Sequence, residues 1–314
     1  MTGPHPLDPL SVDELSAAER LVRGHARFSG AMRFTSTELR EPAKHAVLAW
    51  RLGAAVVRVA RTVLLDTGTG AVIEVVIDLN RGAVASWEAV PLDRPPYGQP
   101  GIICDEFLRV GQIVKADPAW RAAVLRRGLV QADLDLVQVD PFSAGNFGYP
   151  EEQGRRLVRA VSYWRGDLAD NGYAHPIEGV VAVVDLIANR ILTLVEDDVA
   201  VPVPRKKSNY GRADLPPPRT DLKPLSIVQP EGPSFAIDGW EVIWQNWRFQ
   251  VGFTPREGLV LHQLGASPGG LNGGAVCGPD DQPLLEERVR RLRVWARQTR
   301  QPVGIIPTGI IFDL

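Results

Sequence analysis

The side chains best suited to metal chemistry in this chain are its histidines, and their spacing does not predict a metal site. They stand at His5, His25, His45, His175 and His262. No two of them are separated by one or by three residues, so neither a strand nor a helix would present two imidazoles side by side. We therefore expect structural roles for them and no metal ion bound to this chain.

Tyrosine and serine chemistry has an equally weak basis. Asn209 and Tyr210 match the first two positions of the Asn-Tyr-acid motif around a self-processing tyrosine, but Gly211 follows where an acid is required. The sequence contains no Gly-x-Gly-x-x-Gly motif, no phosphate-binding loop and no Gly-x-Ser-x-Gly elbow. No catalytic, cofactor-binding or metal-binding residue is predicted from motifs, and neither nucleotide binding nor serine hydrolysis is expected.

Composition excludes several classes of partner. The chain has 314 residues, of which 45% are hydrophobic, so more than one core can be filled. A net charge of -2 attracts neither nucleic acid nor an anionic membrane, although the arginine-dense run at 286–300 leaves a basic helix as an alternative. Cys104 and Cys277 lie far apart, and neither a signal peptide nor a membrane span is evident, which favours the cytoplasm.

Two stretches of the chain each show a helical pattern followed by four strand-like runs, and they predict the fold. In the first, residues 11–26 place apolar side chains on one helical face after a capping-box pair, Ser11 and Glu14. Four runs rich in Val, Ile and Thr follow at 32–39, 54–65, 71–79 and 82–90. One helix against a four-stranded antiparallel sheet is predicted.

The second stretch repeats this order after a Pro- and Gly-rich break. A helical region at 105–127 is interrupted by Pro118. Strand-like runs follow at 134–139, 156–164, 180–186 and 191–195. The predicted fold class is α+β, with two tandem small domains that each pack a helix on a four-stranded antiparallel sheet.

A change of composition marks the end of the second unit. Residues 201–224 are rich in Pro, Lys and Arg without periodicity, which predicts an extended connector. Beyond it, runs at 247–253 and 258–262 favour strands of an all-β domain.

The segment that leaves the connector carries a family resemblance. It reads Arg-Thr-Asp-Leu-Lys-Pro-Leu-Ser-Ile at 219–227, Gln-Pro-Glu-Gly-Pro-Ser-Phe at 229–235 and Arg-Glu-Gly-Leu-Val-Leu-His at 256–262. It closely resembles copper amine oxidases where they enter their catalytic domain. Upstream, Pro-Phe-Ser-Ala-Gly at 141–145 and Tyr-Ala-His-Pro-Ile-Glu-Gly at 173–179 resemble the second small domain of that family, and the likeness covers roughly residues 6–264.

This resemblance implies a division of the chain into five parts. They are a first small α+β domain at 1–95, a second at 96–204, an extended linker at 205–224, the first strands of a catalytic β-sandwich domain at 225–264, and an aberrant tail at 265–314. The family likeness ends at Leu264, so we expect the matched portion to be truncated or frameshifted after that residue.

The resemblance also implies an activity. Copper amine oxidases convert a primary amine, O2 and water to an aldehyde, ammonia and hydrogen peroxide, with copper and topaquinone as cofactors, and they are homodimers. In the family the groups that bind copper and do the chemistry lie downstream of the position matching Leu264, so none carries over to a residue here. We expect this chain alone to be inactive and to bind neither cofactor.

Three aromatic residues form the only candidate site. Phe107, Phe142 and Tyr173 match positions that line the substrate entrance in some members of the family. The alternative for each ring is packing in a hydrophobic core.

The tail, residues 265–314, departs from the family pattern. Moving the codons of residues 285–302 by one nucleotide permits most of the family motif Trp-Lys-Asn-x-Phe-Asp-x-Gly-Glu-Tyr-Gly, although Leu292 with Arg293 cannot supply its first glycine. Trp295 has a single codon and still permits a required glycine. We therefore expect an out-of-frame tail that packs poorly, with a real C-terminal domain as the alternative.

Two other functions stay open at this point. One is a non-catalytic binding or assembly module built from the two small domains. The other is a peptidase-inhibitor-like module, which rests on the helix-plus-four-strand architecture alone and is therefore weakly founded.

Overall fold

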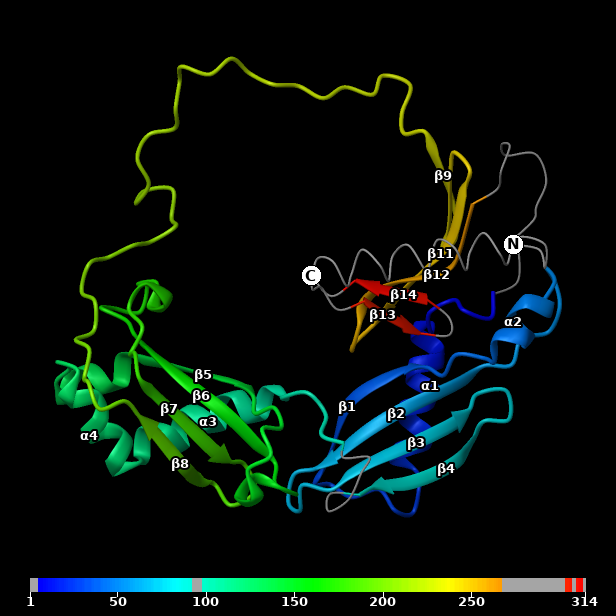
Figure 1. The fold of residues 1–314 in the computed structure, drawn as a ribbon. Coiled ribbons are helices and arrows are strands. Elements are labelled where there is room, and N and C mark those ends of the chain that lie inside the picture. Colours follow the sequence, from blue (N-terminus) through cyan, green and yellow to red (C-terminus); the bar gives the residue numbers. More distant parts are fainter. Residues whose placement is uncertain (1–4, 92–97, 267–302, 307–308, 313–314) are drawn as a thin grey trace.

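The computed structural model describes residues 5–91, 98–266, 303–306 and 309–312, in which two helix-covered sheets precede a third sheet (Figure 1). The first sheet has the order β1-β2-β3-β4, the second β5-β6-β7-β8, and the third β13-β14-β12-β11-β10-β9. Neighbouring strands are antiparallel throughout. The predicted α+β class with two tandem small domains is confirmed.

The first domain packs one helix on one face of its sheet. The elements are α1 (Val12–Arg23), β1 (Met32–Leu39), a short α2 (Lys44–Ala49), β2 (Val59–Asp66), β3 (Val72–Asp78) and β4 (Ala83–Val90). Ala18 and Val22 of α1 are buried against Leu64 of β2 and Val75 of β3. Removing a valine side chain such as that of Val22 from water contributes roughly 1.5–3 kcal/mol, so packing on the sheet stabilises this helix.

The second domain has the same four-stranded sheet covered on one face, but by two α-helices instead of one. Its elements are α3 (Cys104–Ala116), α4 (Pro118–Arg126), β5 (Val137–Ser143), β6 (Leu157–Trp164), β7 (Val180–Asp185) and β8 (Arg190–Glu196), with short 3-10 turns η1 (Gln131–Leu136), η2 (Pro150–Glu152) and η3 (Gly172–Ala174). Asp117 caps α4 by accepting a 2.9 Å hydrogen bond from the Trp120 amide, and Pro118 occupies the first turn, where no amide donor is needed. The buried side chains of both helices face Val158 and Val184 of the sheet.

An arginine fastens the start of α1 to the first sheet. Glu14 accepts a hydrogen bond from the Ser11 amide at 2.8 Å and completes a capping box. The same carboxylate receives two hydrogen bonds from Arg58, at 2.6 and 2.9 Å, immediately before β2. Arg58 also donates to the carbonyls of Asp8 and Pro9, so one guanidinium ties together the helix, the segment before it and the second strand.

The second domain repeats this arrangement. Glu106 accepts from the Ile103 amide at 3.0 Å at the start of α3. Arg156, immediately before β6, donates to both oxygens of Glu106 at 3.0 and 2.7 Å and to the carbonyls of Pro100 and Gly101. The two domains therefore share both a strand order and an arginine–glutamate ion pair at the start of the first helix. Internal duplication of one structural unit would produce this similarity.

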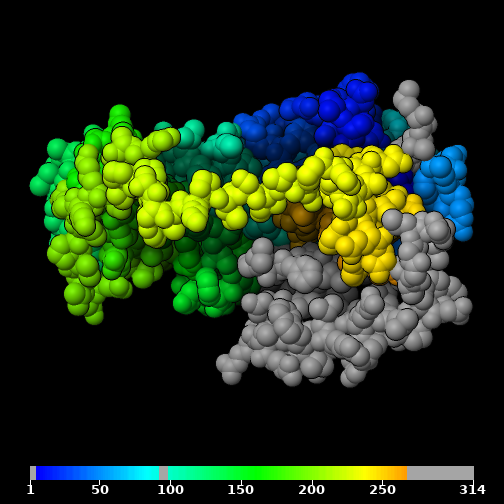
Figure 2. Space-filling view, turned by 90° about the horizontal axis from the view of Figure 1, so that it is seen from above, coloured from blue at the N-terminus to red at the C-terminus, as the bar shows by residue number. Residues whose placement is uncertain are grey.

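The connector begins on the second domain and ends at the third sheet. The Val203 amide donates to the Arg127 carbonyl at 3.0 Å, and His175 Nδ1 donates to the Pro204 carbonyl at 2.7 Å. From residue 211 to residue 234 every side chain is exposed. Figure 2 shows this segment passing from the second domain across to the third sheet.

The third sheet is built from β9 (Phe235–Asp238), β10 (Glu241–Trp244), β11 (Trp247–Thr254), β12 (Gly258–Ala266) and the backbone-paired β13 (Val303–Ile306) and β14 (Gly309–Phe312). Strand alternation and register place a set of apolar residues on one face of β9 to β12. The set is Phe235, Ile237, Val242, Trp244, Trp247, Phe249, Val251, Phe253, Leu259 and Leu261. Phe253 and Leu259 are 68% and 67% exposed, so this apolar face is incompletely covered.

Two predicted strand starts were wrong, and one short helix was not predicted. The strand expected at 54–65 begins only at Val59, and the strand expected at 134–139 begins at Val137. Residues 134–136 instead finish η1, because the Asp133 carboxylate accepts from the Val130 amide at 2.9 Å and holds a turn there. Helix α2 was not predicted because its six residues have no side-chain cap and too little length for a helical period.

The predicted out-of-frame tail lies largely outside the described residues. Of residues 265–314 the structure describes 265–266, 303–306 and 309–312. The last two segments form β13 and β14, and β14 pairs with β12 through Gly309 and His262. Poor packing of the tail stays a prediction.

Candidate functional site

The outer face of the second sheet holds two of the three predicted aromatic residues. Side chains alternate along β5, and Pro141 is buried, so Asp140 and Phe142 lie on the face away from α3 and α4. The Tyr173 hydroxyl, from η3, donates to Asp140 Oδ2 at 2.9 Å. Tyr173 also contacts the Tyr163 ring edge to face at 5.0 Å. Phe142 and Tyr173 therefore share one surface.

Phe107 lies apart from that surface. It is on α3, whose buried residues Val110 and Val114 pack against the inner face of the sheet. Phe107, Phe142 and Tyr173 are 47%, 53% and 60% exposed, which argues against the core-packing alternative for all three rings. The structure brings together two members of the predicted site and places the third in the helical layer.

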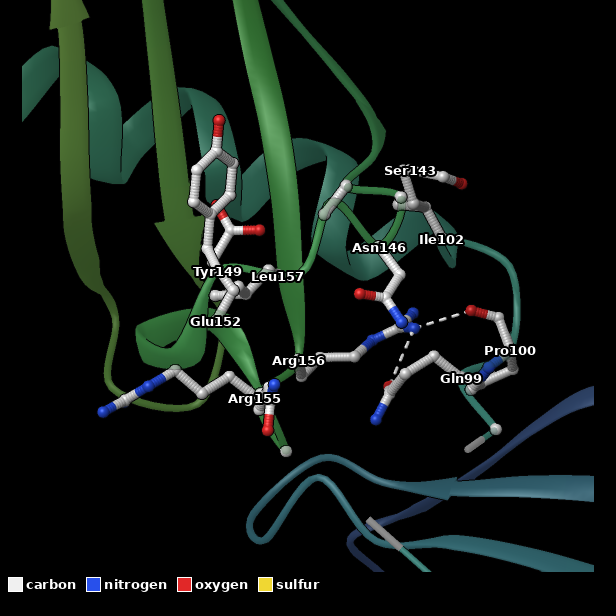
Figure 3. A pocket seen from close by; sticks show the side chains of 15 residues that line it. Gln99, Pro100, Ile102, Ser143, Asn146, Tyr149, Glu152, Arg155, Arg156 and Leu157 are labelled. Atoms are coloured by element: carbon white, nitrogen blue, oxygen red, sulfur yellow. Dashed lines mark hydrogen bonds between the residues drawn. The ribbon is translucent and has the colours of Figure 1, made fainter. Parts of the chain in front are cut away.

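A pocket of about 300 Å³ opens where the second domain begins. The segment with Gln99 and Pro100 forms one wall and the β5–β6 loop with Asn146 and Tyr149 forms another (Figure 3). Its charged lining residues are all paired: Arg156 with Glu106, Arg155 with Asp185 at 2.8 Å, and Glu152 with Arg159 at 2.8 Å. The arginines here hold the domain together and offer no free charge to a ligand.

The histidines of the described residues do not gather into a metal site. Among the described residues, no three His, Cys, Asp or Glu side chains converge as a metal ion would require. His175 is completely buried, with Nδ1 bonded to the Pro204 carbonyl and Nε2 3.2 Å from Asp170 Oδ2. This imidazole anchors the connector, and the donor set of the described residues does not fit copper.

His262 occupies the contact between the third sheet and the first domain. It is buried on β12, with Nδ1 3.8 Å from Glu41 Oε1. Burial lowers the pKa of His262, and the nearby Glu41 carboxylate only partly offsets that effect. Gln250 is the β11 partner of His262, and Gly252, which pairs with Val260, lies diagonally from it. A Cβ at Gly252 would stand 2.6 Å from His262 Nε2, so a larger residue there would displace the buried imidazole. The imidazole is a packing group of the interface.

Sequence reasoning missed Asp140 and the Arg156–Glu106 pair. Asp140 sits beside the Pro-Phe-Ser-Ala-Gly motif, and its alternation with Phe142 on one strand was the available signal. Glu106 was missed because Ile103, three residues earlier, has no side-chain oxygen and so does not look like a cap. None of the helices that the structure describes has the length and apolar character to cross a membrane.

Comparison with known proteins identifies both small domains. Residues 105–214 match the family described as the copper amine oxidase N3 domain, and residues 12–87 match the AGAO-like N2 domain. A primary amine oxidase of Arthrobacter sp. (strain P1) is 44% identical over 261 residues, which cover 83% of this chain and 38% of that protein. A histamine oxidase of Arthrobacter globiformis is 39% identical over 264 residues, covering 83% of this chain and 37% of the relative.

The fold gives the same answer. A copper-containing benzylamine oxidase from Hansenula polymorpha superposes with a TM-score of 0.66 at 20% identity, covering 84% of this chain and 42% of that structure. This likeness supports the fold. The chain spans less than half the length of each of these relatives.

Proposed function

Because the chain belongs to the copper amine oxidase family, we propose that it supplies the N-terminal domains of a primary-amine oxidase and the strands that open its catalytic domain. The observation that carries the proposal is the order of the matches, N2 then N3, followed by the connector and the third sheet. The complete enzyme would convert a primary amine, O2 and water to an aldehyde, ammonia and hydrogen peroxide. Topaquinone, with copper, would supply the electron sink.

The role of this chain within that reaction is structural and positional. The second domain presents Phe142 and Tyr173 on an open face, and we assign them, with Phe107, to the approach of substrate. We expect the chain alone to be inactive, because its described residues do not assemble the nitrogen ligands that a tight Cu(II) site requires. A cytoplasmic, homodimeric full-length enzyme is the corresponding proposal for location and assembly.

A chimera tests this function. Residues 12–264 of this chain would replace the matching segment of the Arthrobacter sp. (strain P1) enzyme, with the parent enzyme as control. We expect the chimera to bind copper, to stain for quinone and to release peroxide from a primary amine. A folded, soluble chimera that does none of these would contradict the proposal.

The isolated chain provides the opposite test. After aerobic incubation with copper, metal analysis should find no stoichiometric copper and a peroxide-coupled assay should find no amine oxidation. One tightly bound copper per chain with peroxide release would show that this chain holds a complete site.

An assembly module is the second candidate, and the exposed apolar face of the third sheet favours it. In that case the isolated chain would form a stable oligomer through this face, and Phe253→Asp would abolish it in light scattering. A monomeric chain at high micromolar concentration would count against this candidate.

A further inference from the structure

The contact between the first domain and the third sheet contains two histidines. Gln250 Nε2 of β11 donates to Asp8 Oδ1 at 2.5 Å, and Asp8 Oδ2 accepts from the His5 amide at 2.7 Å. On β12, the buried His262 lies with Nδ1 3.8 Å from Glu41 Oε1 of the first domain. Both imidazoles are therefore at the boundary where the two units meet.

His5 is neutral in this contact. Its Nδ1 accepts a 3.1 Å hydrogen bond from the Leu7 amide, so that nitrogen carries no proton. The ring also hydrogen-bonds the Gln263 side chain of β12 and lies edge-on against Trp50, with the ring centroids 4.9 Å apart. Protonating Nδ1 would break the bond to Leu7 and would place a charge in a half-buried position.

A second proton on His262 would be poorly compensated. Its side chain is 5% exposed, and no atom of the described residues forms a hydrogen bond with Nδ1. The Glu41 carboxylate, at 3.8 Å, is beyond hydrogen-bonding distance. Burial lowers the pKa of His262, and it is also the main cause of the lowered pKa of His5. The closed contact therefore favours the neutral form of both imidazoles.

The charges around the two rings do not reverse this preference. Asp8 and Glu241 favour the charged form of His5, but burial outweighs them and keeps the pKa of His5 low. Glu241 also accepts two hydrogen bonds from Arg248, at 2.6 and 2.8 Å. His5 and His262 would repel each other if both were charged.

One carboxyl group at the contact titrates in the opposite direction. Glu38 of β1 faces Arg61 of β2 and, across the contact, Arg256 and Glu257 of the β11–β12 turn. Burial is the main cause that raises the pKa of Glu38, so the closed contact favours its protonated form. The free pKa of glutamate, about 4.3, lies well below that of histidine, about 6.5, so the histidines respond first as pH falls from neutral.

We propose that the contact between the first domain and the third sheet is proton-sensitive, closed while His5 and His262 are neutral and opened as they take up protons. An imidazole whose pKa is lower in the closed state stabilises that state fully above the free value, about 6.5. This stabilisation is lost as pH falls through the lowered value. The exposed connector keeps both units in one chain when the contact is open. The inference does not depend on the proposed oxidase function.

Cysteine labelling measures the opening. The two native cysteines, Cys104 and Cys277, are first replaced by serine. Val260→Cys then places a thiol on the buried face of β12 that also carries His262, and Leu259→Cys places one on the exposed face. The ratio of their labelling rates with iodoacetamide removes the effect of pH on the thiol itself. From about pH 7.5 to about pH 5.5 this ratio should rise severalfold, by at most about tenfold for each histidine.

The double variant His5→Gln, His262→Gln should flatten this rise, because glutamine does not titrate near neutral pH. Each ratio is compared with its own value at neutral pH, so a general weakening of the contact does not affect the result. His25→Gln is the matched control and should keep the rise, because its imidazole stacks on Trp87 at 4.5 Å within the first domain. A ratio that does not change with pH, or that rises equally in the double variant, would overturn the proposal. A parallel loss of circular dichroism would also overturn it, since the exposure would then come from unfolding.

Discussion

Both small domains join their first helix to their sheet through an arginine–glutamate ion pair, and the two pairs differ in burial. In the first, the Arg58 side chain is 7% exposed and Glu14 is 24% exposed. In the second, Arg156 and Glu106 are 4% and 2% exposed. The hydrogen bonds are almost the same in number and kind, so burial is the main difference between them. Breaking the ion pair is therefore expected to lower the free energy of unfolding more in the second domain than in the first.

The largest effect is expected from Glu106→Ala. Removing this carboxylate leaves the buried Arg156 guanidinium without its counter-charge, which typically costs about 3–5 kcal/mol. Urea unfolding followed by circular dichroism should show this loss in the free energy of unfolding of the second domain. A loss below about 1 kcal/mol would mean that water reaches Arg156 and that the two domains do not differ in the way described.

A smaller loss, roughly 1–2 kcal/mol, is expected from Glu14→Ala, because solvent screens the Arg58 pair and one capping interaction disappears. The same unfolding experiment measures it, with Glu19→Ala on the exposed face of α1 as control. If Glu14→Ala cost as much as Glu106→Ala, burial would not be the property that separates the two domains.

Acid should weaken the Glu14 contribution in a predictable direction. Burial alone would raise the pKa of Glu14, but hydrogen bonds from Arg58 and from the Ser11 backbone outweigh it and hold this pKa below its usual value. The stabilisation is therefore complete above the unfolded carboxyl pKa, about 4.3, and is lost as pH falls through the folded value. The difference in unfolding free energy between wild type and Glu14→Gln should shrink as pH falls below about 4.3. A difference that grows in acid would have the wrong sign.

The smallest effect tests whether the domains act separately. Gly70, in the β2–β3 turn, has φ +77°, and a Cβ there would stand 3.1 Å from Ile187 of the second domain. Gly70→Ala should cost about 1 kcal/mol, mainly from the left-handed backbone. The cost should appear in the unfolding of the first domain. Gly82→Ala, also at positive φ but in open space, is the control; equal effects would show that the contact with Ile187 adds nothing.

Much of the fold was accessible from the sequence because the apolar periods are long and the turns are marked. The runs at 71–79 and 82–90 became β3 and β4, and Pro118 divides α3 from α4 as expected. Short elements escaped this reasoning: β9 and β10 have four residues each, too few to show an alternation above chance.

The candidate site was predictable only in part. Phe142 and Tyr173 could be named from a resemblance, but the hydrogen bond that joins Tyr173 to Asp140 spans 33 residues and depends on η3 folding over the outer face of β5 and β6. The pairing of Glu106 with Arg156 spans 50 residues and depends on the whole domain. A local sequence pattern does not show which residues separated by 30 to 50 positions will pair.

The length and stiffness of the connector determine the effective concentration of the third sheet around the second domain. It is held on the second domain at Val203, Pro204 and Asn209, and residues 210–234 lead from there to β9. These exposed residues could reach roughly 80 Å when extended. Its run of three prolines at 216–218 resists collapse, so its end-to-end distance exceeds that of a flexible coil. A tether of this kind holds its two ends at an effective concentration in the millimolar range or below. At such a concentration, weak contacts would be enough to hold the third sheet near the second domain. Replacing the three prolines by glycines would change the rate at which the two ends of the connector approach each other, without altering any contact in either domain.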